Sequence, residues 1–127
     1  MSQRPRLGYC LALTLAMLPA PLMAEPWLCS FTVECDPTAG CASGGFTAQV
    51  IAADHADELF LSTAVGDSPI IRLTAPDSLP ASYAGAARAG TAELVTIEAD
   101  RTAIMSVHLF DGDARAITYF GTCEELT

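Results

Sequence analysis

Lysine is absent from this chain of 127 residues, and basic side chains are scarce. Six arginines stand against 15 aspartates and glutamates, so the formal net charge is −9 at pH 7. Such a charge repels phosphate backbones and anionic lipid headgroups, which argues against nucleic acids and membrane surfaces as partners. The negative charge favours a cationic partner, although a need for solubility alone also explains the acidic composition.

Motifs of the common enzyme classes are missing as well. The chain has no C-x-x-C pair, no paired zinc ligands at short spacing, no G-x-S-x-G turn and no glycine-rich phosphate loop. Ser106 and His108 share one face of a predicted strand, but no third member of a triad is indicated. Among 15 acidic residues no pair stands out for glycoside hydrolysis. We therefore expect no enzyme, no catalytic residues and no cofactor.

The chain has one long hydrophobic run, near its start. An uncharged apolar stretch over residues 7–18 follows two arginines and precedes two prolines. This pattern predicts an export signal over residues 1–24, cleaved after Ala24 or, as an alternative, after Ala20. An uncleaved anchor is also possible, but the apolar stretch is barely long enough to span a bilayer. A lipoprotein cleaved at Cys10 is not expected, because a bulky tyrosine precedes that cysteine.

Cleavage would leave residues 25–127 as one small domain in the periplasm or outside the cell. This domain keeps all of the acidic residues and four arginines, so its formal charge is −11. A core forms at this length, but only a modest fraction of the surface is buried and covalent links help. We therefore expect disulfides to contribute to the stability of this domain.

Four cysteines remain in the predicted mature chain: Cys29, Cys35, Cys41 and Cys123. An even number in a short exported chain predicts disulfides. Cys35 and Cys41 flank an Asp-Pro-Thr-Ala-Gly turn, which favours a local Cys35–Cys41 bond and leaves Cys29 for Cys123. The alternative joins Cys29 to Cys41 and Cys35 to Cys123. Strand alternation does not decide, since Cys29 and Cys35 point to one side. A labile redox pair or a metal site is a weaker hypothesis for these thiols.

Most of the predicted domain alternates apolar and polar residues in short runs separated by turn residues. This pattern predicts an all-β fold, an antiparallel barrel or sandwich of about seven to eight short strands. The segment over residues 75–90 stays open between a loop, a short helix and a weak strand. The expected strands are Trp27–Cys35, Gly45–Ala53, Glu58–Val65, Pro69–Thr74, Thr91–Glu98, Thr102–Phe110 and Ala114–Cys123.

The last two expected strands form a hairpin whose register is predictable. A three-residue loop over residues 111–113 puts Val107 opposite Ile117 and Met105 opposite Tyr119 on the buried face. A two-residue Asp-Gly turn would move Ile117 and Tyr119 to the other face. We favour the three-residue loop. It leaves Ser106, His108 and Thr118 on the outer face.

Two acidic stretches are the remaining candidates for a site. Asp54, His55, Asp57 and Glu58 lie within five residues, which is either a metal cluster or, as we favour, a polar connection between strands. The Asp-Gly-Asp sequence at 111–113 has the same two interpretations, with weak calcium binding as the functional one. No metal site is therefore predicted.

The sequence also predicts whether the single tryptophan and three of the phenylalanines lie in the core or on the outer face. Trp27 is expected to pack in the core beside Cys29. Phe60, Phe110 and Phe120 are placed on outer faces by strand alternation, although the phase near Phe60 is ambiguous. Exposed aromatic rings on a sheet would indicate a partner surface.

The general plan resembles the small periplasmic inhibitors of C-type lysozymes, in the early Cys29, the late Cys123 and the strands between them. The resemblance implies an antiparallel barrel with an early and a late cysteine joined. In that family an inhibitory loop carries Ser-Gly-x-x-Tyr together with a lysine. The nearest stretch here, PASYAGAARAG at 80–90, lacks that motif in register, and the chain has no lysine. No functional residue is carried over from the family.

These features together predict an exported, non-enzymatic β-domain that binds a protein or a small ligand. The acidic composition makes a cationic periplasmic protein one concrete partner, and inhibition of a cationic envelope enzyme such as a lysozyme is one alternative function. A thiol-redox or metal-binding protein is the other alternative.

Overall fold

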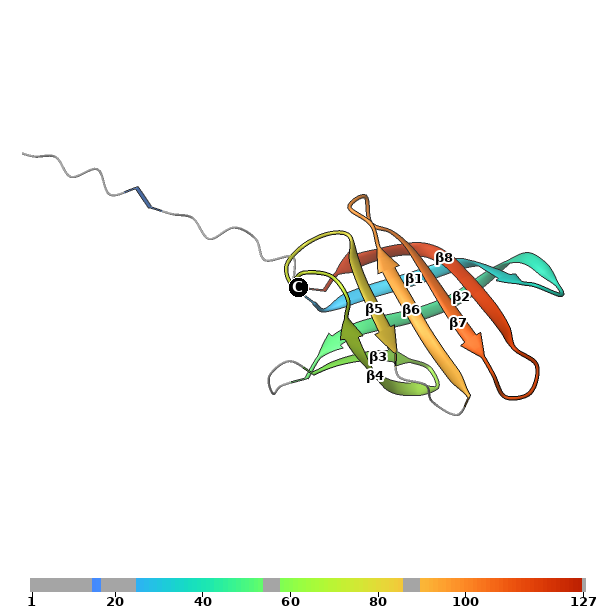
Figure 1. Cartoon of the computed structure of the whole chain (residues 1–127). Helices are drawn as coiled ribbons and strands as arrows, with labels where there is room; N and C mark the ends of the chain where they lie inside the picture. Colours follow the sequence, from blue (N-terminus) through green and yellow to red (C-terminus); the bar gives the residue numbers. More distant parts are fainter. Residues whose placement is uncertain (1–14, 17–24, 54–57, 86–89, 127) are drawn as a thin grey trace, which may run out of the picture.

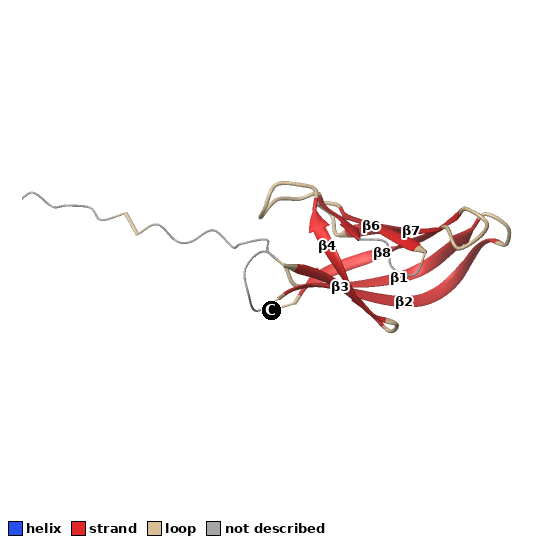
Figure 2. Cartoon of the chain, turned by 60° about the horizontal axis from the view of Figure 1, so that its bottom comes forward, coloured by secondary structure: helices blue, strands red, loops and turns tan. Residues whose placement is uncertain are grey.

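The computed structural model describes residues 15–16, 25–53, 58–85 and 90–126. In these ranges the chain forms one closed barrel of eight antiparallel strands, in which each strand pairs with its neighbours in sequence and β8 pairs with β1 (Figures 1 and 2). The prediction of an all-β antiparallel barrel is confirmed. The strands are β1 Trp27–Asp36, β2 Gly40–Ala52, β3 Leu59–Thr63, β4 Gly66–Arg72, β5 Ala81–Gly85, β6 Thr91–Ile97, β7 Thr102–Leu109 and β8 Arg115–Glu125.

The pairing of β1 with β8 closes the barrel, and a disulfide lies on this seam. Cys29 and Cys123 are direct partners in the register and are bonded to each other. The second disulfide joins Cys35 to Cys41. This is the pairing that the Asp-Pro-Thr-Ala-Gly turn favoured, and it excludes the alternative pairing. Because the sheet is closed, it exposes no unpaired strand edge along the seam.

The core fills the barrel with residues that alternate along each strand. On β1, for example, Trp27, Cys29 and Phe31 are buried while Ser30 and Thr32 are exposed. The period-two pattern of the sequence thus corresponds to inward and outward positions. Trp27 is fully buried, as expected. The buried apolar residues are Trp27, Cys29, Phe31, Ala48, Val50, Leu61, Ile70, Ala81, Tyr83, Val95, Ile97, Ala103, Met105 and Cys123.

The β1–β2 hairpin is longer than predicted, because β2 begins at Gly40 and not at Gly45. In its turn the Asp36 carboxylate accepts hydrogen bonds from the Thr38 backbone N–H (2.7 Å) and hydroxyl (2.6 Å). Gly40 adopts a positive φ of 76°, which a glycine allows without strain. With the Cys35–Cys41 disulfide, these contacts hold strand pairing to the hairpin tip, which projects past the other strands (Figure 1).

The β7–β8 hairpin has the predicted register. Val107 lies opposite Ile117 and Met105 opposite Tyr119. Strand β7 ends at Leu109 and β8 begins at Arg115, so the connection spans residues 110–114 and is longer than the three residues predicted. The register is unchanged, because the longer connection adds one residue to each side of the loop.

The predicted boundary between the third and fourth strands was wrong, and part of the segment over residues 75–90 is a strand. The turn between β3 and β4 falls at residues 64–65, and the Thr63 hydroxyl donates to the Gly66 carbonyl (3.3 Å) across it. Strand β4 therefore begins at Gly66, three residues before the predicted start at Pro69. In the segment 75–90, Ala81–Gly85 is strand β5, so the weak-strand alternative is correct for this part.

The chain alternates between the two ends of the barrel. One end holds the start of β1, the 73–80 and 98–101 connections and the end of β8; the other holds the turns that follow β1, β3 and β7. Among the described residues, no helix is both long and apolar enough to cross a membrane.

Candidate functional site

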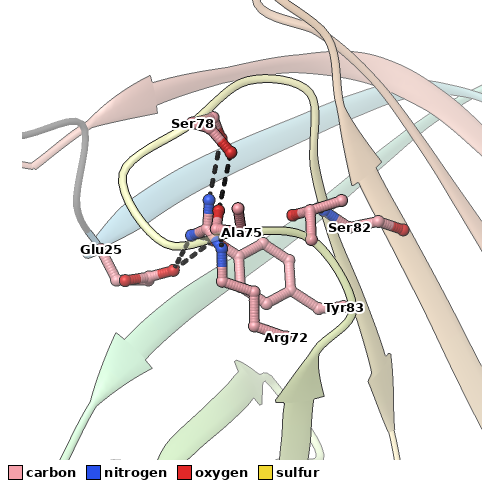
Figure 3. A network of polar contacts seen from close by, with 7 residues as sticks. Glu25, Arg72, Ala75, Ser78, Ser82 and Tyr83 are labelled. Carbon is pink, nitrogen blue, oxygen red and sulfur yellow. Dashed lines mark hydrogen bonds and ion pairs between the residues drawn. The ribbon is translucent and has the colours of Figure 1, made fainter.

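The end of the barrel where β1 begins is closed by a polar network around Arg72 (Figure 3). The Arg72 guanidinium forms an ion pair with the Glu25 carboxylate and donates to the Tyr83 hydroxyl (3.0 Å). The Tyr83 hydroxyl in turn donates to Glu25. Two more guanidinium nitrogens donate to backbone carbonyls, Nε to Ala75 (3.1 Å) and Nη2 to Ser78 (2.8 Å). Every guanidinium nitrogen thus has a partner within the protein, and the 73–80 connection is fixed over this end.

The charges of this network shift the ionisation of its members. Burial opposes ionisation of Glu25, but the hydrogen bonds from Tyr83 and Arg72 outweigh it and hold the pKa of Glu25 below its usual value. Burial, together with the hydrogen bond to Glu25, raises the pKa of Tyr83. The ionised pair and the neutral phenol are therefore the stable forms at neutral pH. The network thus holds the 73–80 connection over this end of the barrel.

The opposite end of the barrel holds a cavity of about 410 Å³. Its walls come from β2, β3, β4, β6, β7 and β8, because the inward positions near this end are not filled to the rim. The volume lies in the range typical of small-ligand pockets, about 300–1,000 Å³. The lining residues are Phe46, Leu61, Thr63, Val65, Ser68, Thr91, Glu93, Met105, Val107 and Tyr119.

Aromatic rings form one wall of this cavity. Phe46 and Tyr119 stack with ring centroids 4.9 Å apart, and Phe31 packs behind them at 6.0 Å from Phe46 and 6.2 Å from Tyr119. Burial, and then the nearby Glu34 carboxylate, raise the pKa of Tyr119. The ring therefore carries a neutral hydroxyl at neutral pH. Met105, its cross-strand partner, is buried at the base of the cavity.

Glu93 is the one carboxylate among the described residues that line the cavity. It shares the inward face of β6 with Val95 and Ile97. Its Oε1 accepts a hydrogen bond from the Thr91 hydroxyl (3.4 Å), whereas its buried Oε2 has no hydrogen-bond partner among the described residues. A buried acceptor without a partner costs about 1–3 kcal/mol, and more when it is charged. The carboxylate thus has one oxygen whose hydrogen-bonding capacity no described group satisfies.

Gly85 provides the space that the Glu93 carboxylate occupies. A Cβ atom at position 85 would lie 2.3 Å from Oε2 of Glu93 and 3.3 Å from its Cβ. Any other residue at position 85 would therefore displace the carboxylate. The missing side chain at position 85 of β5 thus accommodates the Glu93 side chain on the adjacent strand β6.

Of the residues singled out as possible metal ligands, the structure describes only Glu58 and residues 111–113. Asp54, His55 and Asp57 lie outside the described residues, and Glu58 is exposed. Residues 111–113 are exposed in the β7–β8 connection. Within the described ranges, no group of three or more metal-ligating side chains is found.

Ser106 and His108 lie on the outer face of β7, as predicted. His108 is exposed and pairs across the sheet with Ala116, and Ser106 pairs with Thr118. The four cysteines are all in disulfides. None of these residues faces the cavity.

The three phenylalanines expected on outer faces differ in exposure. Phe110 and Phe120 are exposed, at 53% and 43%, while Phe60 is half-buried. Phe120 lies beside its cross-strand neighbours Val33 and Ile104 on the outside of the barrel. The second core layer that would have covered these rings is not seen for Phe110 and Phe120.

The cavity and Glu93 were not anticipated from the sequence. One signal was available: in the stretch TAELVTI at 91–97, Glu93 occupies the same alternating phase as Val95 and Ile97. A carboxylate in the inward phase of a strand is unusual enough to mark a site. Comparisons with protein-family models, with curated proteins and with solved structures found no significant match.

Proposed function

We propose that this protein is an exported, non-enzymatic binding protein that takes a small, largely apolar ligand into the open end of its barrel. The observation that supports this most is the cavity of about 410 Å³ at one end, opposite an end that is plugged by the Arg72 network. A barrel closed at one end and hollow at the other offers one entrance and one binding chamber.

The lining of the chamber favours binding over catalysis. Its walls are mostly apolar and aromatic, with hydroxyls on Thr63, Ser68 and Thr91 and one carboxylate on Glu93. A few polar groups in an apolar pocket are typical of sites that orient a ligand. The lining residues that the structure describes include no histidine, cysteine or lysine to serve as a nucleophile or base.

The disulfides are compatible with a location outside the cytoplasm. Structural disulfides persist in oxidising compartments such as the periplasm and the extracellular space. With the signal-like start of the sequence, they support export of residues 25–127. The proposed ligand is therefore one that is met in the periplasm or outside the cell.

A fluorescence titration tests the proposal. N-phenyl-1-naphthylamine, an uncharged probe that brightens in apolar surroundings, is titrated into the wild-type protein. We expect saturable binding in the micromolar range, since a pocket of this size buries most of such a ligand. The absence of saturable brightening would contradict the proposal.

Two variants of adjacent residues on β7 locate the bound probe. Val107→Trp places a large side chain in the cavity, whereas Ser106→Trp places the same side chain on the outer face. We expect Val107→Trp to weaken probe binding at least about tenfold and Ser106→Trp to change it less than about twofold. Equal effects of the two variants would show that the probe binds elsewhere.

A further inference from the structure

We infer that the ligand of the barrel cavity is an organic cation, a primary ammonium group on an apolar body, and that Glu93 recognises the ammonium group. This inference rests on the proposed function, because it assigns the chemistry of the same cavity. The observation behind it is a carboxylate oxygen that is buried at the cavity wall and has no hydrogen-bond partner among the described residues.

The position of Glu93 is fixed by the fold. It lies on β6 with two further inward residues after it, and pairs with Val107 of β7, which also lines the cavity. Thr91 donates to Oε1. Oε2 is therefore the carboxylate oxygen without a partner among the described residues, and it lies against Gly85, where there is no side chain.

The free protein already bears the desolvation cost of this carboxylate. An ion pair buried from water often gains little, because both ions lose their hydration on forming it. Here one partner is already buried, so an incoming ammonium supplies the missing donor and restores part of what burial removed. A ligand without a hydrogen-bond donor leaves the desolvation cost of the Glu93 carboxylate uncompensated.

The rest of the chamber suits a cation with an apolar body. The stacked rings of Phe46 and Tyr119 present a π-surface, which attracts a nearby cation, and Met105 and Leu61 offer apolar contact. Among the lining residues that the structure describes there is one carboxylate, Glu93, and no arginine. An anionic ligand would meet this carboxylate and no described cation in the chamber wall.

Three compounds with the same octyl chain and different head groups test the inference. Octylammonium, octanol and octanoate are each used to displace N-phenyl-1-naphthylamine at neutral pH and about 0.15 M salt, where attraction between exposed charges is largely screened. We expect octylammonium to displace the probe at a concentration at least about tenfold lower than octanol, with octanoate weakest. Equal displacement by the three compounds would overturn the assignment to Glu93.

Glu93→Gln removes the charge and nearly preserves the shape of the side chain. We expect it to bring octylammonium to within about twofold of octanol. Glu124→Gln, which removes an exposed carboxylate of β8, is the matched control and should keep the full preference. A preference for octylammonium that survives Glu93→Gln, or that disappears in Glu124→Gln, would show that the general acidity of the protein and not Glu93 selects the cation.

The outcomes separate this inference from the proposed function. Binding of the probe and of all three octyl compounds without preference leaves the cavity as a binding site and overturns the role of Glu93. Failure of the probe itself to bind overturns both. If Glu93→Gln does not fold, Gly85→Ala displaces the carboxylate without altering it, and retention of the full preference in that variant would likewise overturn the inference.

Discussion

The two disulfides should differ sharply in what they contribute to stability, and the difference follows from the chain length that each one closes. Cys29–Cys123 joins residues 94 apart on the barrel seam, whereas Cys35–Cys41 joins residues 6 apart at a hairpin tip. In the chain-entropy model these loops contribute about 4.7 and about 2.2 kcal/mol to the free energy of unfolding. The expected difference is about 2.5 kcal/mol.

Packing adds to this difference in the same direction. Cys29 and Cys123 are 1% and 3% exposed, so replacing both with alanine also leaves a gap in the core. Cys41 is exposed and Cys35 half-buried, so their replacement removes little packing. The seam variant should therefore lose at least about 5 kcal/mol, which is comparable to the whole stability of many small domains.

Urea denaturation of the two double variants, Cys29→Ala/Cys123→Ala and Cys35→Ala/Cys41→Ala, measures the difference. The single tryptophan, Trp27, is fully buried, and its fluorescence reports the loss of the core. We expect the hairpin variant to fold with a reduced midpoint and the seam variant to be largely unfolded without urea. Equal midpoints, or a seam variant more stable than the hairpin variant, would refute the reasoning.

Three further predictions follow from single contacts. Gly121→Ala should lower the free energy of unfolding by at least about 3 kcal/mol, because the new Cβ would lie 2.0 Å from a backbone oxygen of β1; a wild-type melting temperature would contradict this. Gly85→Ala should reduce the preference for octylammonium over octanol at least about threefold by displacing the carboxylate of Glu93, while probe binding persists; an unchanged preference in the displacement assay would count against it. Because the pKa of Glu25 is lowered on folding from 4.5, its contribution to stability is complete above that pH and is lost as the pH falls through the folded value. Tyr83→Phe should reduce the loss of unfolding free energy between pH 7 and pH 3, which urea titrations at the two pH values would measure. The same loss in the variant as in the wild type would contradict this.

Much of the fold was predictable because period two is a local property of the sequence. The alternation over Trp27–Phe31 gave the inward face of β1, and the residue parity of Met105, Val107, Ile117 and Tyr119 gave the β7–β8 register. The expectation that Cys35 shares the face of Cys29 was wrong, because a bulge between Phe31 and Val33 turns Val33 and Cys35 to the outer face. The cysteine pairing followed from one turn, since the Asp-Pro-Thr-Ala-Gly stretch brings Cys35 and Cys41 together. Each of these inferences needed only near neighbours in sequence.

The assignment of β5 needed contacts with other strands. Strand β5 is only five residues long and rich in small side chains, and its pairing with β4 and β6 makes it a strand. Local propensity does not contain these pairings. The early start of β2 was missed although its contacts are local, because the predicted Cys35–Cys41 bond lies within strand pairing that continues to Gly40.

The site was the least predictable part. A cavity is the space that inward side chains from six strands fail to fill, so it appears only when the barrel has closed. The acidic stretches that drew attention, residues 54–58 and 111–113, are clusters along the chain. Glu93 is a lone carboxylate between apolar neighbours, and only its strand phase marked it.

The central claim is that the open end of the barrel is the binding chamber, and methyl NMR with octylammonium tests it most directly. Met105 and Val107 line the cavity, Ile97 is buried towards the plugged end, and Ile104 lies on the outer face. We predict saturable shifts for the methyl groups of Met105 and Val107, with those of Ile97 and Ile104 nearly unchanged. Shifts confined to Ile104, or none at saturating ligand, would contradict the account.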